Sequence, residues 1–191
     1  MTLVVETGEG LNNANSYASR SDGDDYHARM IPEYATVWTG ADNAHKEAAL
    51  MFATRVIDMN VDWNGYRRST TQALEWPRIY VTNDDDYYIT YGQPSLAVPV
   101  NWGPYFPIDQ IPPRLKYATC ELARELLTKD RTKDWAAKGI SRLSLGQGAL
   151  AVDFDQNTWD KPNVMTDQVR AMLQVFGTLR LQRTRARVNR A

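Results

Sequence analysis

The stretch V-D-W-N-G-Y-R-R-S-T-T-Q-A-L-E-W-P-R at residues 61–78 constrains the fold of this chain more than any other. Its aromatic side chains are Trp63, Tyr66 and Trp76. Each aromatic side chain buries roughly 150–250 Å², so these three can clamp the end of one helix to the segment that follows it. Gly65 permits a sharp turn, and Pro77 ends a helix or strand at the preceding residue. The stretch therefore predicts a structural corner with buried aromatic side chains and arginines in solvent.

Length and composition narrow the class of protein. A chain of 191 residues suits one domain with peripheral additions, or two small domains. Its 43% apolar content is enough for a core, and no apolar run is long enough to span a membrane. The single cysteine, Cys120, excludes an internal disulfide and fits a reducing compartment. The first residues lack the basic and apolar regions of a secretory signal. We expect a soluble, intracellular, globular protein.

Charge is distributed unevenly along the chain. Residues 170–191 contain six arginines and no acidic residue. Of the 22 basic and 23 acidic side chains, this leaves 16 basic and 23 acidic in residues 1–169, a net charge of −7. An acidic body with a basic tail predicts that the tail meets an anion, either a nucleic acid or an acidic protein surface.

The basic tail, residues 178–191, aligns its arginines in either regular conformation. An extended tail places alternate arginines on one face, and a helical tail aligns those three and four residues apart. Guanidinium groups pair bidentately with carboxylate and phosphate, although a solvated, disordered terminus is the alternative. The predicted partner-binding residues of the tail are Leu179, Arg180, Leu181, Arg183, Arg185, Arg187 and Arg190.

Apolar periodicity predicts about four helices. The first is capped by Ser19 or Ser21 and runs to about Glu33, and the second extends from the start signal at 39–42 to Asn60. Ala48, Ala49, Phe52, Ala53, Val56 and Met59 form the apolar face of the second helix. The third runs from Pro112 to about Lys129, and the last is capped by Asn163 or Thr166 and ended by Gly177.

Two segments have strand-like patterns. Residues 79–110 form a long excursion with two short strand candidates, 87–91 and 96–100, joined at Gly92. Such a long irregular connection either contacts a partner or covers the core. Its predicted partner-binding residues are Tyr87, Tyr88, Trp102, Tyr105 and Phe106. The second segment, 140–155, alternates about Gly146 and Gly148 and predicts a hairpin.

The residues needed for catalysis or metal binding are scarce. His27 and His45 fall on helical turns that we expect to face solvent, and Cys120 lies among apolar helix residues. No phosphate-binding loop occurs, and the D-x-D-x-N at 153–157 lacks the later ligands of a calcium loop. We therefore expect no enzymatic activity, no cofactor and no metal.

Several motifs together resemble one protein family. They are N-S-Y-A-S at 15–19, K-E-A-A-L at 46–50, W-N-G-Y-R at 63–67, Q-A-L-E-W-P-R at 72–78 and I-P-P-R-L-K-Y-A-T-C-E-L-A at 111–123. The chain resembles tailed-bacteriophage proteins described as DnaT-like single-stranded-DNA-binding proteins, which are similar in organisation to head–tail connector (adaptor) proteins. The signature residues of this resemblance are Trp63, Gly65, Tyr66, Arg67, Trp76, Pro77 and Arg78.

The resemblance implies a ring-forming subunit of the virion neck. Such a ring, commonly twelvefold, docks on the portal, contacts downstream tail or neck proteins and lets DNA pass without sequence-specific binding. The subunit would reside in the host cytoplasm until assembly. We expect a mainly α fold, a small bundle of about four helices with the inserted excursion and the second hairpin. The helical domain would span 1–177 and the tail 178–191.

The rival reading is a single-stranded-DNA-binding protein of phage DNA metabolism. Stacking platforms for single strands combine aromatic and basic side chains. The corner supplies Trp63, Tyr66, Arg67, Arg68, Trp76 and Arg78. The net charge of −7 over residues 1–169 opposes this reading, because an acidic body repels phosphate.

Overall fold

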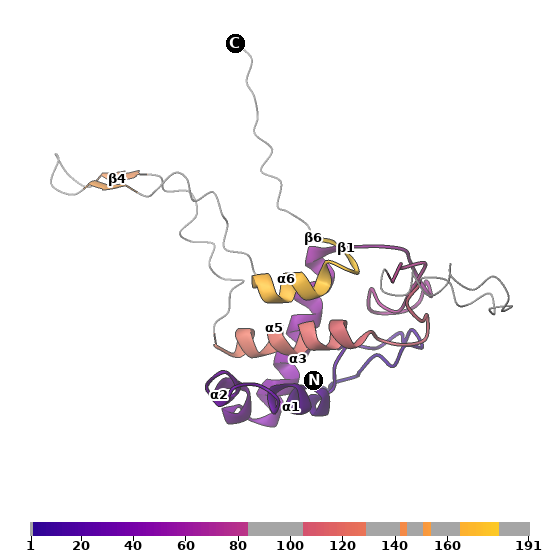
Figure 1. The fold of residues 1–191 in the computed structure, drawn as a ribbon, viewed down its shortest axis with the longest axis horizontal. Coiled ribbons are helices and arrows are strands. Elements are labelled where there is room, and N and C mark those ends of the chain that lie inside the picture. The colour runs from indigo at the N-terminus through magenta and orange to yellow at the C-terminus, as the bar shows by residue number, and fades with distance from the viewer. Residues whose placement is uncertain (1, 84–104, 129–141, 145–150, 154–164, 180–191) are drawn as a thin grey trace, which may run out of the picture.

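The computed structural model describes residues 2–83, 105–128, 142–144, 151–153 and 165–179. Its helices over these residues are α1 (Arg20–His27), α2 (Pro32–Gly40), α3 (Asn43–Asn60), α5 (Pro113–Thr128) and α6 (Asp167–Leu173). Figure 1 shows α5 between α6 on one side and α1 and α2 on the other, with α3 crossing behind it. The predicted mainly α class is confirmed. Among the described helices, none combines the length and apolarity needed to cross a membrane.

The predicted first helix is divided into α1 and α2. Ser19 caps α1 in a capping box, in which the Asp22 backbone N–H donates to Ser19 Oγ at 3.0 Å. The helix ends at His27 instead of near Glu33, because Pro32 disfavours a helical conformation at the residue before it and begins α2 itself.

Close contact between α1 and α2 depends on a glycine. A Cβ added at Gly23 would lie 2.4 Å from a ring carbon of Trp38, which is fully buried. Because Gly23 has no side chain, the indole of Trp38 in α2 can pack directly against α1.

α3 crosses the core with a face that differs from the predicted one. Asp42 caps it, accepting the His45 backbone N–H at 2.8 Å. Ala49, Ala53 and Val56 are buried as predicted. The prediction was wrong for Ala48 and Met59, which are exposed, and it missed Leu50 and Ile57, which are fully buried. The buried face is shifted because α3 packs against α5, and Leu50 and Ile57 belong to the core cluster that the apolar residues of α5 also form.

α5 and α6 complete the core. Leu115, Ala118, Leu122 and Ala123 of α5 are buried as predicted, and Val169, Leu173 and Phe176 pack beside them. Thr166 caps α6. Gly177 does not end this helix, which already ends at Leu173. It lies instead against β1, where an added Cβ would be 2.3 Å from the Asp62 carbonyl oxygen.

Within the described residues, three short antiparallel strand pairs accompany the helices. β1 (Val61–Trp63) pairs with β6 (Gly177–Leu179), β2 (Tyr66–Arg67) with β3 (Arg78–Ile79), and β4 (Arg142–Ser144) with β5 (Ala151–Asp153). The β4–β5 pair lies inside the predicted second hairpin. Thr178 and Leu179, the first residues of the predicted tail, belong to β6, so the chain enters residue 180 from a strand that is fixed to β1.

The two ends of the long excursion lie side by side and are hydrogen-bonded to each other. Thr82 and Tyr105 form an isolated antiparallel bridge, and the Phe106 N–H donates to the Val81 carbonyl at 2.9 Å. The strand candidates at 87–91 and 96–100 lie outside the described residues. So do residues 180–191 of the tail.

Candidate functional site: the aromatic–arginine corner

The corner, residues 61–78, reverses direction at Gly65. This glycine has φ +64°, and a Cβ there would lie 2.1 Å from the Ile79 carbonyl oxygen. A residue with a side chain would meet both backbone strain and a clash, so the predicted sharp turn at Gly65 is confirmed.

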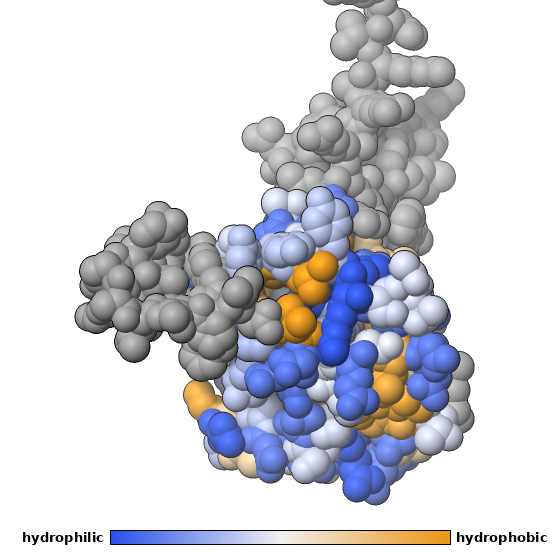
Figure 2. Space-filling view, turned by 90° about the vertical axis from the view of Figure 1, so that its right-hand side faces the viewer, coloured by the Kyte–Doolittle hydropathy of each residue, from blue (hydrophilic) through white to orange (hydrophobic). Residues whose placement is uncertain are grey.

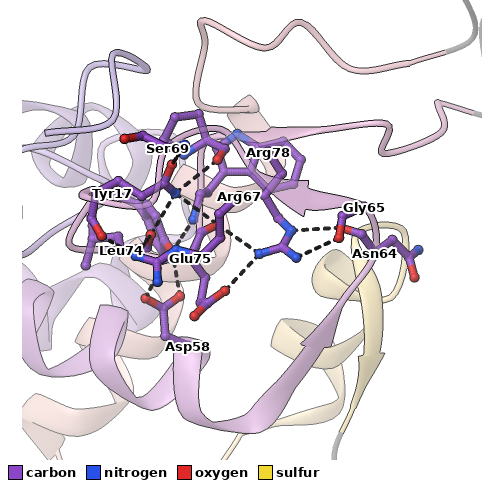
Figure 3. Close-up of polar contacts among 12 residues, drawn as sticks. Tyr17, Asp58, Asn64, Gly65, Arg67, Ser69, Leu74, Glu75 and Arg78 are labelled. Carbon is purple, nitrogen blue, oxygen red and sulfur yellow. Dashed lines mark hydrogen bonds and ion pairs between the residues drawn. The ribbon is translucent and has the colours of Figure 1, made fainter.

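Arg78 braces the corner from inside (Figure 3). Its Nε donates to the Asn64 carbonyl at 2.7 Å, and one Nη donates to the Gly65 carbonyl at 2.8 Å. The other Nη donates to the Glu75 carboxylate at 2.8 Å and to the Glu75 carbonyl at 3.1 Å. The side chain is 8% exposed. The expectation of a solvated arginine was wrong here, because the planar guanidinium satisfies backbone carbonyls that would otherwise be buried without a donor.

The two tryptophans of the corner pack into the core. Trp76 is fully buried, with ring centroids 5.2 Å from Phe176, 6.1 Å from Trp63 and 6.1 Å from Phe106. Its indole N–H donates to the Gln110 carbonyl at 3.0 Å, and the following peptide bond, to Pro77, is cis. The predicted aromatic clamp is confirmed for Trp63 and Trp76.

A buried carboxyl group joins three segments behind the corner. Tyr17 of the N-terminal arm donates its hydroxyl to Asp58 of α3 at 2.5 Å and accepts the Trp76 backbone N–H at 3.1 Å. The Glu75 N–H donates to the second Asp58 oxygen at 3.2 Å. Burial raises the pKa of Asp58 to about 7, although hydrogen bonds from Tyr17 and Glu75 oppose the shift. Sequence reasoning missed this contact, because Tyr17 and Asp58 are 41 residues apart.

The other two arginines of the corner also bind backbone. Arg67 donates to the carbonyl of Gln72 and, at 3.4 Å, to that of Leu74. Arg68 donates to the Gly8 carbonyl at 2.5 Å and to the Ile108 carbonyl at 3.4 Å. Both side chains remain exposed at the surface, so their charges lie at the rim of the corner.

Tyr66 does not clamp the corner. It is 70% exposed, and the prediction was wrong because the strand turns its side chain outward. Tyr80, with the uncommon φ of +61°, is 63% exposed and packs edge-on against Tyr105 at 5.8 Å. Ile108, bonded to Arg68 through its carbonyl, is also exposed. We call Tyr66, Tyr80, Tyr105 and Ile108 the hairpin patch.

Figure 2 looks onto the end of the molecule that carries the corner. Orange hydrophobic groups are interrupted there by blue polar side chains over the described surface. This end therefore combines apolar contact area with charge, as protein-binding and nucleic-acid-binding surfaces both do.

A second group of exposed apolar side chains lies on the helices. Ile31, which precedes α2, is 62% exposed, Tyr34 of α2 is 60% exposed, and Tyr117 of α5 is 39% exposed. Tyr117 stacks on Tyr26 of α1 with ring centroids 5.2 Å apart, and the Arg124 guanidinium lies 5.9 Å from the Tyr34 ring centroid. We call Ile31, Tyr34 and Tyr117 the helix patch. In Figure 1, α2 lies at the left end of α5, and the loops of the corner lie at its right end.

The histidines and the cysteine do not assemble a catalytic group. His27 is fully buried against Trp38, with Nε2 3.2 Å from the Cys120 carbonyl oxygen, so its predicted exposure was wrong. Burial lowers the pKa of His27. Burial also raises the pKa of the Cys120 thiol to about 12, which disfavours a reactive thiolate. His45 is exposed beside Asp42. Within the described ranges, no cluster of metal-ligating side chains is present.

The remaining predicted partner-binding residues divide into two groups. Phe106 packs against Trp76 and Phe176, and Leu179 is half-buried in β6 opposite Val61. The others lie outside the described residues: Tyr87, Tyr88, Trp102, Arg180, Leu181, Arg183, Arg185, Arg187 and Arg190. Sequence reasoning missed the helix patch. Ile31 beside Pro32 was the available signal, because a proline-led helix start leaves the preceding apolar side chain outside the helix.

The fold and the corner define a class: a mainly α domain whose aromatic–arginine motif serves its own architecture. The chain belongs to the family described as "Putative DnaT-like ssDNA binding protein", whose model matches residues 1–191. That description names single-stranded DNA, so it favours the DNA-binding alternative over the neck-adaptor reading. Among curated proteins and among solved structures, nothing matches the chain.

Proposed function

We propose that this protein is a structural, non-enzymatic assembly subunit that forms the head–tail adaptor ring of a phage neck and docks on the portal. Its place would be the virion neck, with DNA passing through the ring. The observation that carries the proposal is the separation of two exposed apolar patches, the helix patch and the hairpin patch. Contiguous exposed apolar groups with polar rims mark protein interfaces, and two different patches allow one subunit to contact two neighbours.

Several side chains of the corner are buried and stabilise the domain itself, and this supports the same proposal. Trp76 and Arg78 are buried, so these two of the six residues of the hypothetical stacking platform cannot meet a base, and Trp63 is half-buried. The signature residues of the corner then stabilise the fold of the domain. The residues that contact partners would be those of the two patches and the tail.

The test of the adaptor role is docking on the cognate portal. Purified full-length chain mixed with portal should form a stoichiometric ring complex, measured by native mass spectrometry. A variant that lacks residues 180–191 retains β6 and should dock more weakly. Isolated exposed ion pairs contribute only about 0–1 kcal/mol each, so apolar side chains of the tail must contribute as well. Absence of any complex with full-length chain would contradict the proposal.

Single-stranded DNA binding is the second candidate, and the family description favours it. The hairpin patch offers exposed tyrosine rings at Tyr66, Tyr80 and Tyr105, beside the exposed Arg67 and Arg68. Base–aromatic stacking contributes about 1–3 kcal/mol per base, so three rings could hold a short strand. The −7 charge of residues 1–169 opposes it.

Salt dependence separates the two candidates. A binder that makes about five phosphate contacts loses affinity with a log–log slope near −3.5 on single strands. An oligonucleotide titration by fluorescence anisotropy at low salt measures this slope. Micromolar affinity with that slope, lost in Tyr66→Ala, would support DNA binding; no binding at low salt would exclude it.

A further inference from the structure

His27 is a buried histidine at the place where α1 and α2 meet α5. Its side chain, on α1, is fully buried. Its ring centroid lies 5.1 Å from that of Tyr26 and 4.8 Å from that of Trp38 of α2. Its Nε2 atom meets the Cys120 carbonyl of α5. The imidazole therefore contacts all three helices, which also contact one another.

The hydrogen bond to α5 fixes which nitrogen of His27 carries the proton. Nε2 lies 3.2 Å from the Cys120 carbonyl oxygen, which can only accept, so Nε2 is the donor. Nδ1 is buried and has no hydrogen-bond partner among the described residues. In the neutral ring Nδ1 is an acceptor, whereas in the protonated ring it becomes a second N–H donor. A buried donor without an acceptor is destabilising, so this packing fits the neutral ring and not the imidazolium.

Each acidic side chain that faces His27 in the described part of the chain is already paired with a basic one. Asp24 of α1 accepts from the Lys46 ammonium of α3 at 2.8 Å. Glu121 of α5 pairs with Arg124. The second carboxylate oxygen of Glu121 also has no partner among the described residues, but it does not lie in hydrogen-bonding geometry to Nδ1. An imidazolium here would therefore gain little from the surrounding charges.

We propose that His27 holds α1 and α2 against α5 only while its imidazole is neutral, so that acid opens this part of the domain. The inference does not depend on the assembly role proposed above. Opening would also change the helix patch, because Tyr34 belongs to α2 and Tyr117 to α5.

The direction of the effect follows from the two protonation states. Burial lowers the pKa of His27 below its ordinary value of 6.5, although the hydrogen bond to the Cys120 carbonyl opposes the shift. Once opened, the histidine regains its ordinary pKa and binds a proton more readily. The closed form is thus fully stable above about pH 6.5 and loses stability as the pH falls from there through the lowered pKa. Between the two pKa values, each pH unit raises the opened fraction about tenfold.

The other titratable groups beside His27 keep their protonation state in this range. Burial raises the pKa of Tyr26 and of the Cys120 thiol, so both stay neutral. Partial burial would raise the pKa of Asp24, but hydrogen bonds from Lys46 and Trp38 outweigh it and keep the pKa below its ordinary value. A change between pH 6.5 and 5 at this junction therefore reports on His27.

An NMR titration of the full chain measures the pKa of His27 directly. The chain has two histidines, and the variant His45→Gln removes the signals of the exposed one, so the His27 ring is assigned without ambiguity. We expect His27 to titrate below 6.5, with the proton of the neutral ring on Nε2.

Amide hydrogen exchange between pH 6.5 and 5 tests whether the opening is local. Protection factors in α1 and α2 should fall by about tenfold or more relative to those in α3 and α6. The Asp58 carboxyl changes stability in the opposite direction, so it cannot cause such a fall. His27→Gln keeps an N–H donor for the Cys120 carbonyl but does not titrate, and it should abolish the fall. His45→Gln is the matched control and should behave like wild type, because His45 is exposed.

Three results would overturn the inference. His27 could titrate at or above 6.5, which would mean that Glu121 turns to accept the Nδ1 proton. Protection could fall equally in every described helix, which would mean that His27 affects only global unfolding. His27→Gln could also keep the acid sensitivity of α1 and α2. If that variant does not fold, the titration and the exchange of the wild-type chain still decide the question.

Discussion

Replacing Arg78 by lysine keeps the positive charge but removes the planar fork. The guanidinium makes four hydrogen bonds, to the carbonyls of Asn64, Gly65 and Glu75 and to the Glu75 carboxylate. An ammonium group has a single nitrogen and cannot reach carbonyls on both sides of the corner. We expect two of the four bonds to be lost at about 1–2 kcal/mol each, so the free energy of unfolding should fall by about 2–4 kcal/mol.

Urea unfolding followed by tryptophan fluorescence measures this loss. With an m-value of about 2 kcal/mol per molar urea, the midpoint should fall by about 1–2 M. Arg55→Lys is the matched control, because Arg55 is exposed and its guanidinium lies 5.1 Å from the Phe52 ring centroid. That variant should lose less than about 1 kcal/mol. Equal midpoints for the two variants would refute the idea that Arg78 braces the corner.

Three further changes test other parts of the structure. Gly65→Ala adds backbone strain and a Cβ 2.1 Å from a carbonyl oxygen, so the free energy of unfolding should fall by about 3 kcal/mol or more; a loss below about 1 kcal/mol in urea would contradict the tight turn. The pKa of Asp58 is raised to about 7, so the folded protein binds more protons than the unfolded chain between about pH 4 and 7 and loses stability as pH rises through that window. Asp58→Asn should remove this dependence, gaining up to about 4 kcal/mol relative to wild type from pH 4 to 8, and parallel pH curves would show that the carboxyl titrates normally. Glu6 accepts the backbone N–H groups of Gly8, Gly10 and Leu11, each at 2.9 Å, so Glu6→Gln should speed amide exchange in the arm by roughly tenfold, a cost of about 1.4 kcal/mol. Unchanged exchange at these three amides would count against that role of the carboxylate.

Local signals in the sequence predicted the parts of the fold that depend on neighbouring residues. Ser19, Asp42 and Thr166 cap helices as their spacing indicates, because a cap needs only a side-chain oxygen and an N–H two or three residues later. The turn at Gly65, the half-buried Trp63 and the buried Trp76 also followed from local chemistry.

Contacts between distant segments could not be predicted in the same way. The β1–β6 pair joins strands of three residues, which are too short to display a period. The buried face of α3 depends on where α5 packs, so Leu50 and Ile57 replaced Met59 and Ala48 in the core.

Prediction of the candidate site from the sequence was limited in the same way, because the site depends on contacts between distant segments. A sequence lists arginines and tyrosines at the corner, but only the fold separates Arg78, which is buried, from Tyr66, which is exposed. The helix patch combines residues of α2 and α5 that are about 80 residues apart in the chain, so the signal at Ile31 and Pro32 does not indicate that Tyr117 belongs to it.

Native mass spectrometry of one mixture tests the central claim most directly. The mixture contains the full-length chain, the cognate portal ring and a single-stranded oligonucleotide at low salt. If the chain is an assembly subunit, the spectrum should contain portal rings that carry copies of the chain, and no oligonucleotide bound to it. Free portal, together with monomers of the chain bound to oligonucleotide, would contradict the account.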